Sequence, residues 1–207
     1  MIRVIDRTNK DLFAKSLDQL FRLRHDCFVK ERGWHQFDKD GIYEQDQYDD
    51  DNAIYLASID EQDDVIGCMR LYPSTLPHML SEQFPYLVKG PVPRGDDTIE
   101  MTRMAIKPDS RGKRTYCELL IGMQEFCISR NILRTTALIR WLRMPIVQAT
   151  GYHLEELGSV QEMEGDPVIV VMFEMSDTVL GKIRNYAGVQ QSVMENMDIA
   201  AAARKIA

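Results

Sequence analysis

The sequence contains no long apolar run and no cluster of metal ligands. None of its 207 residues lies in an apolar stretch of the roughly 18 residues that a membrane-spanning helix needs. The first residues lack the basic start and apolar stretch of a secretory signal. The four cysteines form no C-x-x-C pair, and the four histidines show no ligand spacing. We therefore expect a cytoplasmic chain with no membrane insertion, no metal site and no disulfide framework.

The charge is acidic overall but uneven along the chain. A net charge of -7 argues against nucleic-acid binding. Residues 103–143 nevertheless carry nine basic and three acidic residues, a net charge of +6, which leaves -13 for the remainder. This asymmetry indicates two ligands of opposite charge, unless the basic residues belong to ordinary helix surfaces and cluster by chance.

The apolar periodicity predicts an α/β fold in one domain, residues 1–207. Helices are expected at 11–31, 113–130 and 141–150, and a tail from about 177 is expected to be helical with a disordered end. Strands are expected at 2–6, 53–59, 65–72, 99–106, 134–139 and 168–173, with a short one starting at Tyr152. Residues 33–51 are expected to form a loop whose length favours a functional role.

An acidic stretch occupies the second half of this loop, with five carboxylates between Glu44 and Asp51. It is either a solvated turn or a wall for a cationic ligand, held in place by Arg24 and Arg70. Arg24 falls on the apolar stripe of the first helix. A buried guanidinium there needs a carboxylate partner, whereas one that reaches solvent does not.

Glu100 and Arg103 form a second candidate pair, on the strand at 99–106. A carboxylate at position 100 is suited to accept a proton from an attacking amine. On a regular strand the two side chains point to opposite faces, so we predict a β-bulge between them. Without the bulge, Arg103 forms a structural ion pair on the other face.

These residues together resemble the LuxI-type acyl-homoserine-lactone synthases. The match covers roughly residues 20 to 175. The flanking segments ERGW, YDDDNAIYL, GCMRLYP and LPHMLSEQFP also look similar to the family's sequences. The positions that match in order and spacing are Arg24, Phe28, Trp34, Asp46, Asp49, Arg70, Glu100 and Arg103.

The resemblance implies a fold like that of GNAT N-acetyltransferases, with three layers and a twisted, mostly antiparallel sheet that is splayed in its centre. It implies that the α-amine of S-adenosylmethionine attacks an acyl thioester, after which the methionyl carboxylate displaces methylthioadenosine and closes the lactone. Both compounds are substrates, so no separate cofactor is expected, and no obligate protein partner.

The resemblance also implies roles for individual residues. Glu100 is the expected general base with Arg103 as its orienting partner, and Asp46 is assigned to catalysis and to binding of the ammonium group. The S-adenosylmethionine pocket is expected to comprise Arg24, Phe28, Trp34, Asp46, Asp49 and Arg70. The acyl pocket and thioester arm are assigned to Thr102, Met104, Arg111, Lys113, Met123, Phe126, Thr136, Ala137, Trp141 and Met144.

The acyl group and its carrier stay open at this level. The family's base rate favours acyl carrier protein, whereas Trp141-Leu142 and ERGW are closer to a branch that includes acyl-CoA users. An ordinary acetyltransferase is a weaker alternative, because Arg114 and Tyr116 stand where its pyrophosphate loop has small residues. A catalytically silent binding protein is a further alternative, which turnover would exclude.

Overall fold

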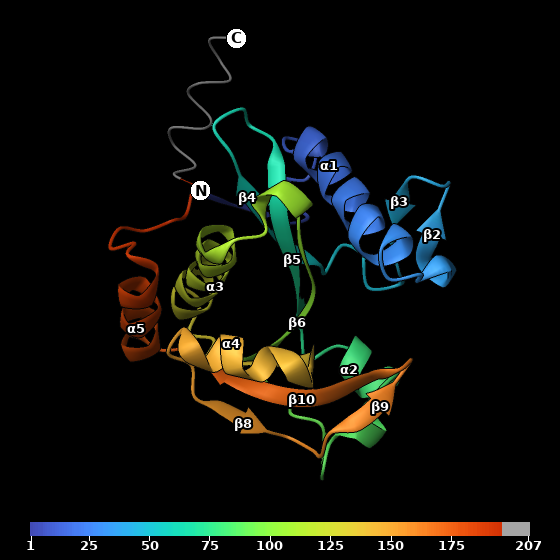
Figure 1. Cartoon of the computed structure of the whole chain (residues 1–207), viewed down its shortest axis with the longest axis vertical. Coiled ribbons are helices and arrows are strands. Elements are labelled where there is room, and N and C mark those ends of the chain that lie inside the picture. Colours follow the sequence, from blue (N-terminus) through green and yellow to red (C-terminus); the bar gives the residue numbers. More distant parts are fainter. Residues whose placement is uncertain (196–207) are drawn as a thin grey trace.

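The computed structural model describes residues 1–195, except the side chain of Lys113. It contains one large sheet with helices on both faces (Figure 1). The strands are β1 (Ile2–Ile5), β4 (Ile54–Ile59), β5 (Val65–Pro73), β6 (Thr98–Ile106), β7 (Arg134–Arg140), β8 (Leu154–Glu156), β9 (Gln161–Met163) and β10 (Asp166–Glu174). Two short strands, β2 (Asp38–Lys39) and β3 (Tyr43–Glu44), form a separate hairpin.

The sheet runs in the order β1-β4-β5-β6-β7-β10-β8, and β9 pairs with β10. Every pair is antiparallel except β6 with β7, which is parallel. That parallel contact covers only Thr98–Glu100 against Arg134–Thr136, after which the two strands part. The expected twisted and splayed sheet is therefore confirmed, and the splay begins at Glu100.

The helices form the two outer layers. They are α1 (Ala14–Arg24), α2 (Met79–Glu82), α3 (Lys113–Ile128), α4 (Met144–Ala149) and α5 (Asp177–Ala187). Short 3₁₀ turns are η2 (His35–Phe37), η3 (Pro85–Leu87), η4 (Pro108–Ser110) and η5 (Trp141–Arg143), and η1 (His25–Lys30) is a π-helix. In Figure 1, α1 lies on one side of β5, and α3 and α5 lie on the other.

Two main apolar clusters fill the spaces between these layers. One joins the inner side chains of α3, α4 and α5 to the sheet, with Leu119, Met123 and Phe126 at its centre. The other joins α1 and η1 to the opposite face, through Leu20, Phe28 and neighbouring side chains. The three-layer arrangement predicted for the fold is confirmed.

Several predicted elements differ from the structure in length or type. The predicted helix 11–31 is an α-helix only to Arg24 and continues as a π-helix to Lys30. The predicted loop 33–51 contains η2 and the β2–β3 hairpin. The helix expected at 141–150 begins with a 3₁₀ turn, and β9 and α2 were not predicted.

The tail is helical only in its first part, because α5 ends at Ala187 and residues 188–195 are not helical. The helix expected from about 177 is α5, capped by the Ser176 hydroxyl, which accepts a hydrogen bond from the Val179 amide. The disordered end that was expected lies at 196–207, outside the described residues. Among the residues that the structure does describe, no helix is both long and apolar enough to cross a membrane.

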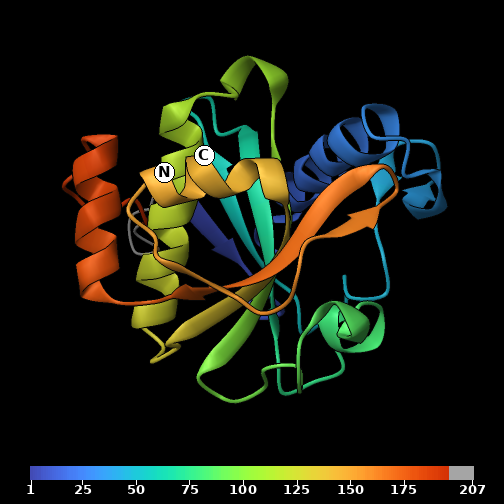
Figure 2. The same ribbon diagram turned by 60° about the horizontal axis from the view of Figure 1, so that its bottom comes forward.

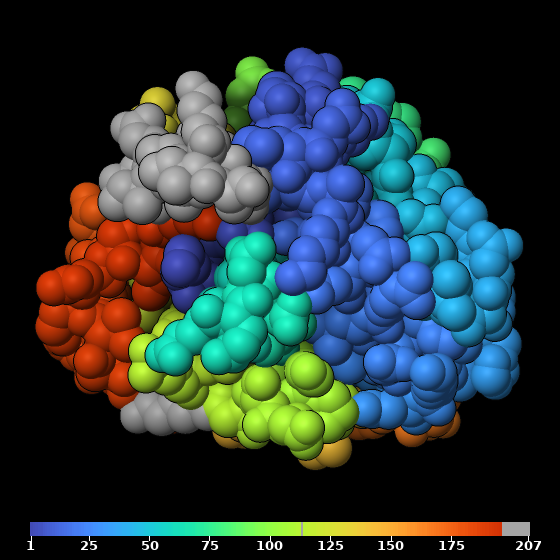
Figure 3. Space-filling model, turned by 90° about the horizontal axis from the view of Figure 1, so that it is seen from above, coloured from blue at the N-terminus to red at the C-terminus, as the bar shows by residue number. Residues whose placement is uncertain are grey.

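Two views show how the outer segments lie around the sheet. Figure 2 shows η5 and α4 over the sheet, between α3 and the β9–β10 hairpin. Figure 3 shows the face on which α1, the β4–β5 turn and the segment before α3 lie side by side. Two contacts join these segments: Gln19 of α1 donates a hydrogen bond to Asp64, and Arg111 forms an ion pair with Glu31.

Candidate active site

Three arginines and three carboxylates form a closed ring of ion pairs beside the sheet. Each carboxylate joins two arginines, and each arginine joins two carboxylates. Taken around the ring, the members are Arg24, Glu44, Arg103, Asp46, Arg70 and Asp49. Their side chains are at most 6% exposed, so the charges are compensated almost entirely by one another.

The side of the ring next to α1 is held by two-point contacts. Arg24 Nη1 and Nη2 donate to the two carboxylate oxygens of Asp49 at 2.7 and 2.8 Å, and Arg24 Nε donates to Glu44 at 2.5 Å. Asp49 also accepts a hydrogen bond from the Tyr55 hydroxyl at 2.9 Å. Burial opposes ionisation of Asp49, but the charges of Arg24 and Arg70 prevail and hold its pKa well below the usual range.

The side next to the sheet is held by β5 and β6. Arg70 on β5 donates to both oxygens of Asp46, at 2.5 and 3.0 Å, and through Nε to Thr102 Oγ1 at 3.0 Å. Arg103 on β6 donates to Glu44 at 2.8 Å, and its Nη2 lies 2.7 Å from Asp46. The carboxylate partners expected for Arg24 and Arg70 are therefore present, while the bridging role of Glu44 was not predicted.

The backbone at Arg103 explains how its side chain reaches the ring. Arg70 pairs with Thr102 and Cys68 with Ala105, so two residues of β6, Arg103 and Met104, oppose one residue of β5. Arg103 has φ of +54°, in the left-handed region. The predicted bulge is present but starts at Arg103 itself, not between Glu100 and Arg103, and it turns this side chain to the face that carries Arg70.

Glu100 is held by α2 and not by Arg103. Its carboxylate accepts hydrogen bonds from the Leu80 amide at 2.7 Å and the Met79 amide at 3.1 Å. Burial raises its pKa to about 7, against the lowering effect of these amides and of Arg70. The expectation that Arg103 orients Glu100 was wrong. Within the described part of the chain, Arg103 forms its ion pairs with Glu44 and Asp46.

An aromatic pair lies next to the ring. Phe28, in η1, stacks on Trp34 with 5.1 Å between ring centroids and 11° between planes. The guanidinium of Arg103 is 5.4 Å from the Trp34 centroid and 5.8 Å from that of Phe28. Two of the predicted pocket residues thus lie within cation–π distance of Arg103, which was assigned to catalysis.

The residues assigned to the acyl group lie mostly on the other side of the sheet. Met123, Phe126, Ala137 and Met144 belong to the buried α3 cluster, Met104 packs against it, and Trp141 is 39% exposed. Thr136 is the residue of β7 paired with Glu100, where the strands part, and its buried hydroxyl has no hydrogen-bond partner among the described residues. Thr102 lies instead with the ring, as the acceptor of Arg70.

Arg111, which was predicted to contact phosphate, has partners within the protein. Its Nη2 pairs with the Glu31 carboxylate, and its Nε donates to the carbonyl of Ile106 at 3.1 Å. Lys113 is the first residue of α3. The side chain of Arg111 is 45% exposed, so the phosphate contact expected there stays a prediction.

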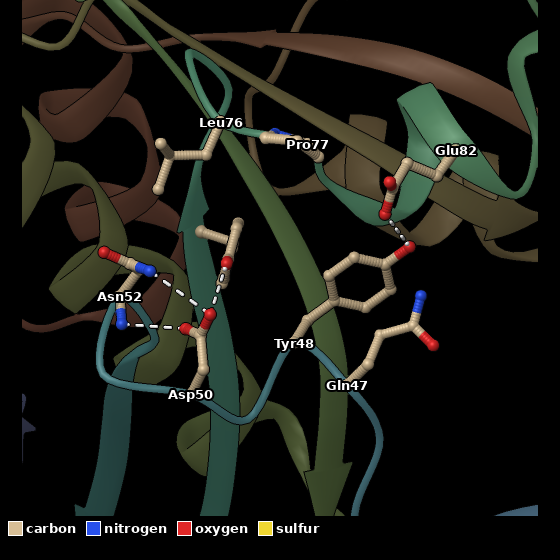
Figure 4. A pocket seen from close by; sticks show the side chains of 8 residues that line it. Gln47, Tyr48, Asp50, Asn52, Leu76, Pro77 and Glu82 are labelled. Carbon is tan, nitrogen blue, oxygen red and sulfur yellow. Dashed lines mark hydrogen bonds between the residues drawn. The ribbon is translucent and has the colours of Figure 1, made fainter.

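A cavity of about 280 Å³ lies beside the acidic segment (Figure 4). Tyr48 donates from its hydroxyl to Glu82 at 2.9 Å, and Tyr72 donates to Asp50 at 2.9 Å. Asn52 completes this polar wall. Asp50 belongs to the acidic stretch singled out in the sequence, whereas Tyr72, Asn52 and Glu82 were not selected.

Comparisons with known proteins agree with the geometry. The family model for autoinducer synthases matches residues 9–183. An isovaleryl-homoserine lactone synthase of Bradyrhizobium diazoefficiens is 31% identical over 198 residues, covering 95% of this chain and 90% of that protein. The solved structure of BjaI, a CoA-dependent acyl-homoserine lactone synthase with SAM and isopentyl-CoA, has a TM-score of 0.88 at 29% identity and covers 99% of each chain.

The fold is shared more widely. A putative N-acetyltransferase from Lactobacillus plantarum has a TM-score of 0.59 at 18% identity, covering 84% of this chain and 99% of the other. At that identity the likeness shows the fold alone, and it confirms the predicted N-acyltransferase architecture. The sequence and structural matches together show that the chain belongs to the autoinducer synthase family, the acyltransferases that make acyl-homoserine lactones.

Proposed function

We propose that this chain acylates the α-amine of S-adenosylmethionine from an acyl-CoA, with Glu100 as the general base. The observation that carries the proposal is the position and pKa of Glu100. Its carboxyl group lies where β6 and β7 part, and burial brings its pKa to about 7. A base is most effective when its pKa is close to the working pH.

In the first step, the amine nitrogen forms a bond to the thioester carbonyl carbon and the carbon–sulfur bond breaks, releasing the thiol of CoA. Glu100 takes the proton that the amine loses and passes it to the departing thiolate sulfur, which leaves as the thiol. In the second step, the methionyl carboxylate oxygen attacks the carbon next to the sulfonium. The carbon–sulfur bond breaks, methylthioadenosine leaves with the electron pair, and the lactone ring closes.

The ring of ion pairs orients S-adenosylmethionine and does not attract it by net charge. Its three carboxylates are balanced by Arg24, Arg70 and Arg103. Both oxygens of Asp46 and of Asp49 already accept bonds from the arginines and from neighbouring groups of the chain. These bonds fix the positions from which the two carboxylates attract an ammonium group by their charge. Phe28 and Trp34 provide the aromatic faces for the sulfonium.

The acyl group is proposed to be short, and its pocket to lie between β7 and α3. Met123, Phe126 and Met144 are at most 3% exposed and fill this region, which leaves room for a short or branched chain. The relative named for an isovaleryl product and the relative solved with isopentyl-CoA favour the same class of acyl group and CoA as its carrier.

The test is turnover by the purified chain with S-adenosylmethionine and a panel of acyl-CoA and acyl-carrier-protein thioesters. Mass spectrometry should detect an N-acyl-homoserine lactone together with equimolar methylthioadenosine and free thiol, with a short branched acyl-CoA as the best donor. A folded protein that gives no lactone from any donor would refute the activity. Lactone formed only from carrier-protein thioesters would refute the choice of CoA.

A further inference from the structure

Two arginines near the outer end of β7 have no anionic partner. Arg143 ends η5, and Arg32 follows η1. Both are exposed, and neither side chain has an ion pair or hydrogen bond within residues 1–195. Most other arginines of the chain pair with a carboxylate, including the exposed Arg22 and Arg114.

These two arginines share one corner of the molecule with Arg140. Arg140 is the last residue of β7 and pairs with Asp166, the first residue of β10. The pKa of Arg32 is lowered by the protein packed around it and then by the positive charges of Arg140 and Arg143. The charges that act on one another there are those of three arginines and of Asp166, an excess of two positive charges.

The guanidinium of Arg32 also lies over the aromatic pair. Its carbon is 5.0 Å from the Phe28 centroid and 5.6 Å from that of Trp34. The corner is therefore connected to the proposed S-adenosylmethionine pocket through Arg32. Arg143 has no such contact, so replacing Arg143 changes the charge of the corner without touching the aromatic pair.

The corner lies one strand length from the proposed reaction centre. The β6–β7 pairing ends at Glu100 with Thr136, and Arg140 is four residues farther along β7. Four residues of strand span roughly 13 Å. A pantetheine arm that extends along β7 from a thioester at Glu100 brings its phosphate end to this corner.

Resting on the proposed function, we infer that Arg32 and Arg143 bind the phosphate groups of a CoA thioester, with Arg140 fixed beside them by Asp166. Guanidinium–phosphate contacts are charge-assisted and often bidentate, which suits unpaired arginines at a water-accessible position. We place the phosphate contact at this pair in preference to Arg111, whose Nη2 already pairs with Glu31. CoA carries several phosphates and matches an excess of two charges better than the single phosphodiester of a carrier-protein arm.

The test compares donors with and without phosphate. Steady-state kinetics are measured for the wild type, Arg143→Gln, Arg32→Gln and the double variant, with an acyl-CoA and with the matching acyl-pantetheine, which lacks phosphate. Arg143→Gln should raise KM for acyl-CoA about tenfold, the loss expected for one hydrogen bond to a charged group. The double variant should raise it further. In Arg143→Gln, which has no contact with the aromatic pair, kcat and KM for acyl-pantetheine should stay unchanged.

The matched control is Arg22→Gln, which removes an exposed arginine of α1 that pairs with Asp18. It should leave KM for acyl-CoA within twofold of the wild type. An unchanged KM for acyl-CoA in the double variant would overturn the assignment, as would an equal rise for acyl-pantetheine. The same variants are also assayed with the acyl-carrier-protein thioester. A rise in KM confined to that donor would overturn the assignment, because the arginines would then contact the carrier protein and not CoA.

The outcome is separable from the proposed function. If the chain makes no lactone from any thioester, the activity itself fails, and binding of 3′-phospho-ADP still tests the corner. Calorimetry should then show binding to the wild type that weakens in Arg143→Gln. Binding of equal strength in both proteins would overturn the inference.

Discussion

The two arginine-rich regions of this molecule differ in whether their arginines are paired with carboxylates and buried. In the ring at α1, β5 and β6, each arginine meets two carboxylates and is buried. At the end of β7, Arg32 and Arg143 have no acid and reach solvent. If a buried, paired charge turns to a ligand, its former partner is left without a compensating charge. The ring is therefore suited to fix the positions of its side chains. The unpaired arginines are available for an incoming anion.

Glu100 belongs to neither region, and its replacement should have the largest effect on activity. Glu100→Gln should lower kcat by about 10² to 10⁴, the usual contribution of a general base. Calorimetry should still show binding of S-adenosylmethionine, since the ring remains intact. A kcat within threefold of the wild type would remove Glu100 from the proton transfer.

Breaking the ring should affect folding as well as activity. Asp49→Asn leaves Arg24 and Arg70 with excess positive charge in a buried place, and it should lower the free energy of unfolding by about 3 to 5 kcal/mol in urea titrations. The matched control is Asp51→Asn, which loses only an exposed pair with Lys10 and should cost less than about 1 kcal/mol. Equal losses in the two variants would contradict the distinction between buried ring and exposed pair.

The aromatic pair should matter mainly for one substrate. Trp34→Leu removes a ring proposed to face the sulfonium, and KM for S-adenosylmethionine should rise about tenfold, in line with a partly desolvated cation–π contact. Trp141→Leu is the matched tryptophan control and should leave this KM unchanged. If both variants raise it equally, Trp34 has no specific part in binding.

The smallest expected effect concerns the acyl group. Trp141 is 39% exposed at the start of η5, and Trp141→Leu should admit longer chains. Each methylene newly buried should add about 0.8 kcal/mol, or about fourfold in kcat/KM relative to the short donor. Competition between two acyl-CoA thioesters, read by mass spectrometry, measures this ratio. An unchanged ratio would place Trp141 outside the acyl pocket.

The sequence predicted what depends on periodicity and residue type. Alternation located β5 and β6, and the buried position of Arg24 on an apolar stripe required carboxylate partners, which are present. The parity of Glu100 and Arg103 required a bulge, which is present one position later than predicted. These inferences succeeded because each rests on local geometry.

The remaining features depend on contacts distant in sequence. The α2 turn that holds Glu100 is only four residues long and follows a proline-rich segment. It is too short to show a helical periodicity in the sequence. Glu44 looks like its acidic neighbours in sequence, and only the fold places it between Arg24 and Arg103. The engagement of Arg111 by Glu31 joins residues 80 positions apart.

The pH dependence of kcat/KM tests the role of Glu100 most directly. Burial raises the pKa of Glu100 to about 7, and only the ionised carboxylate accepts a proton. The wild type should therefore lose activity tenfold per pH unit below about pH 7 and level off above it, and Glu100→Gln should retain its low residual activity without this acid limb. An acid limb that persists in Glu100→Gln at the same pH, or a wild-type profile that is flat down to pH 5, would contradict the assignment of Glu100 as the base.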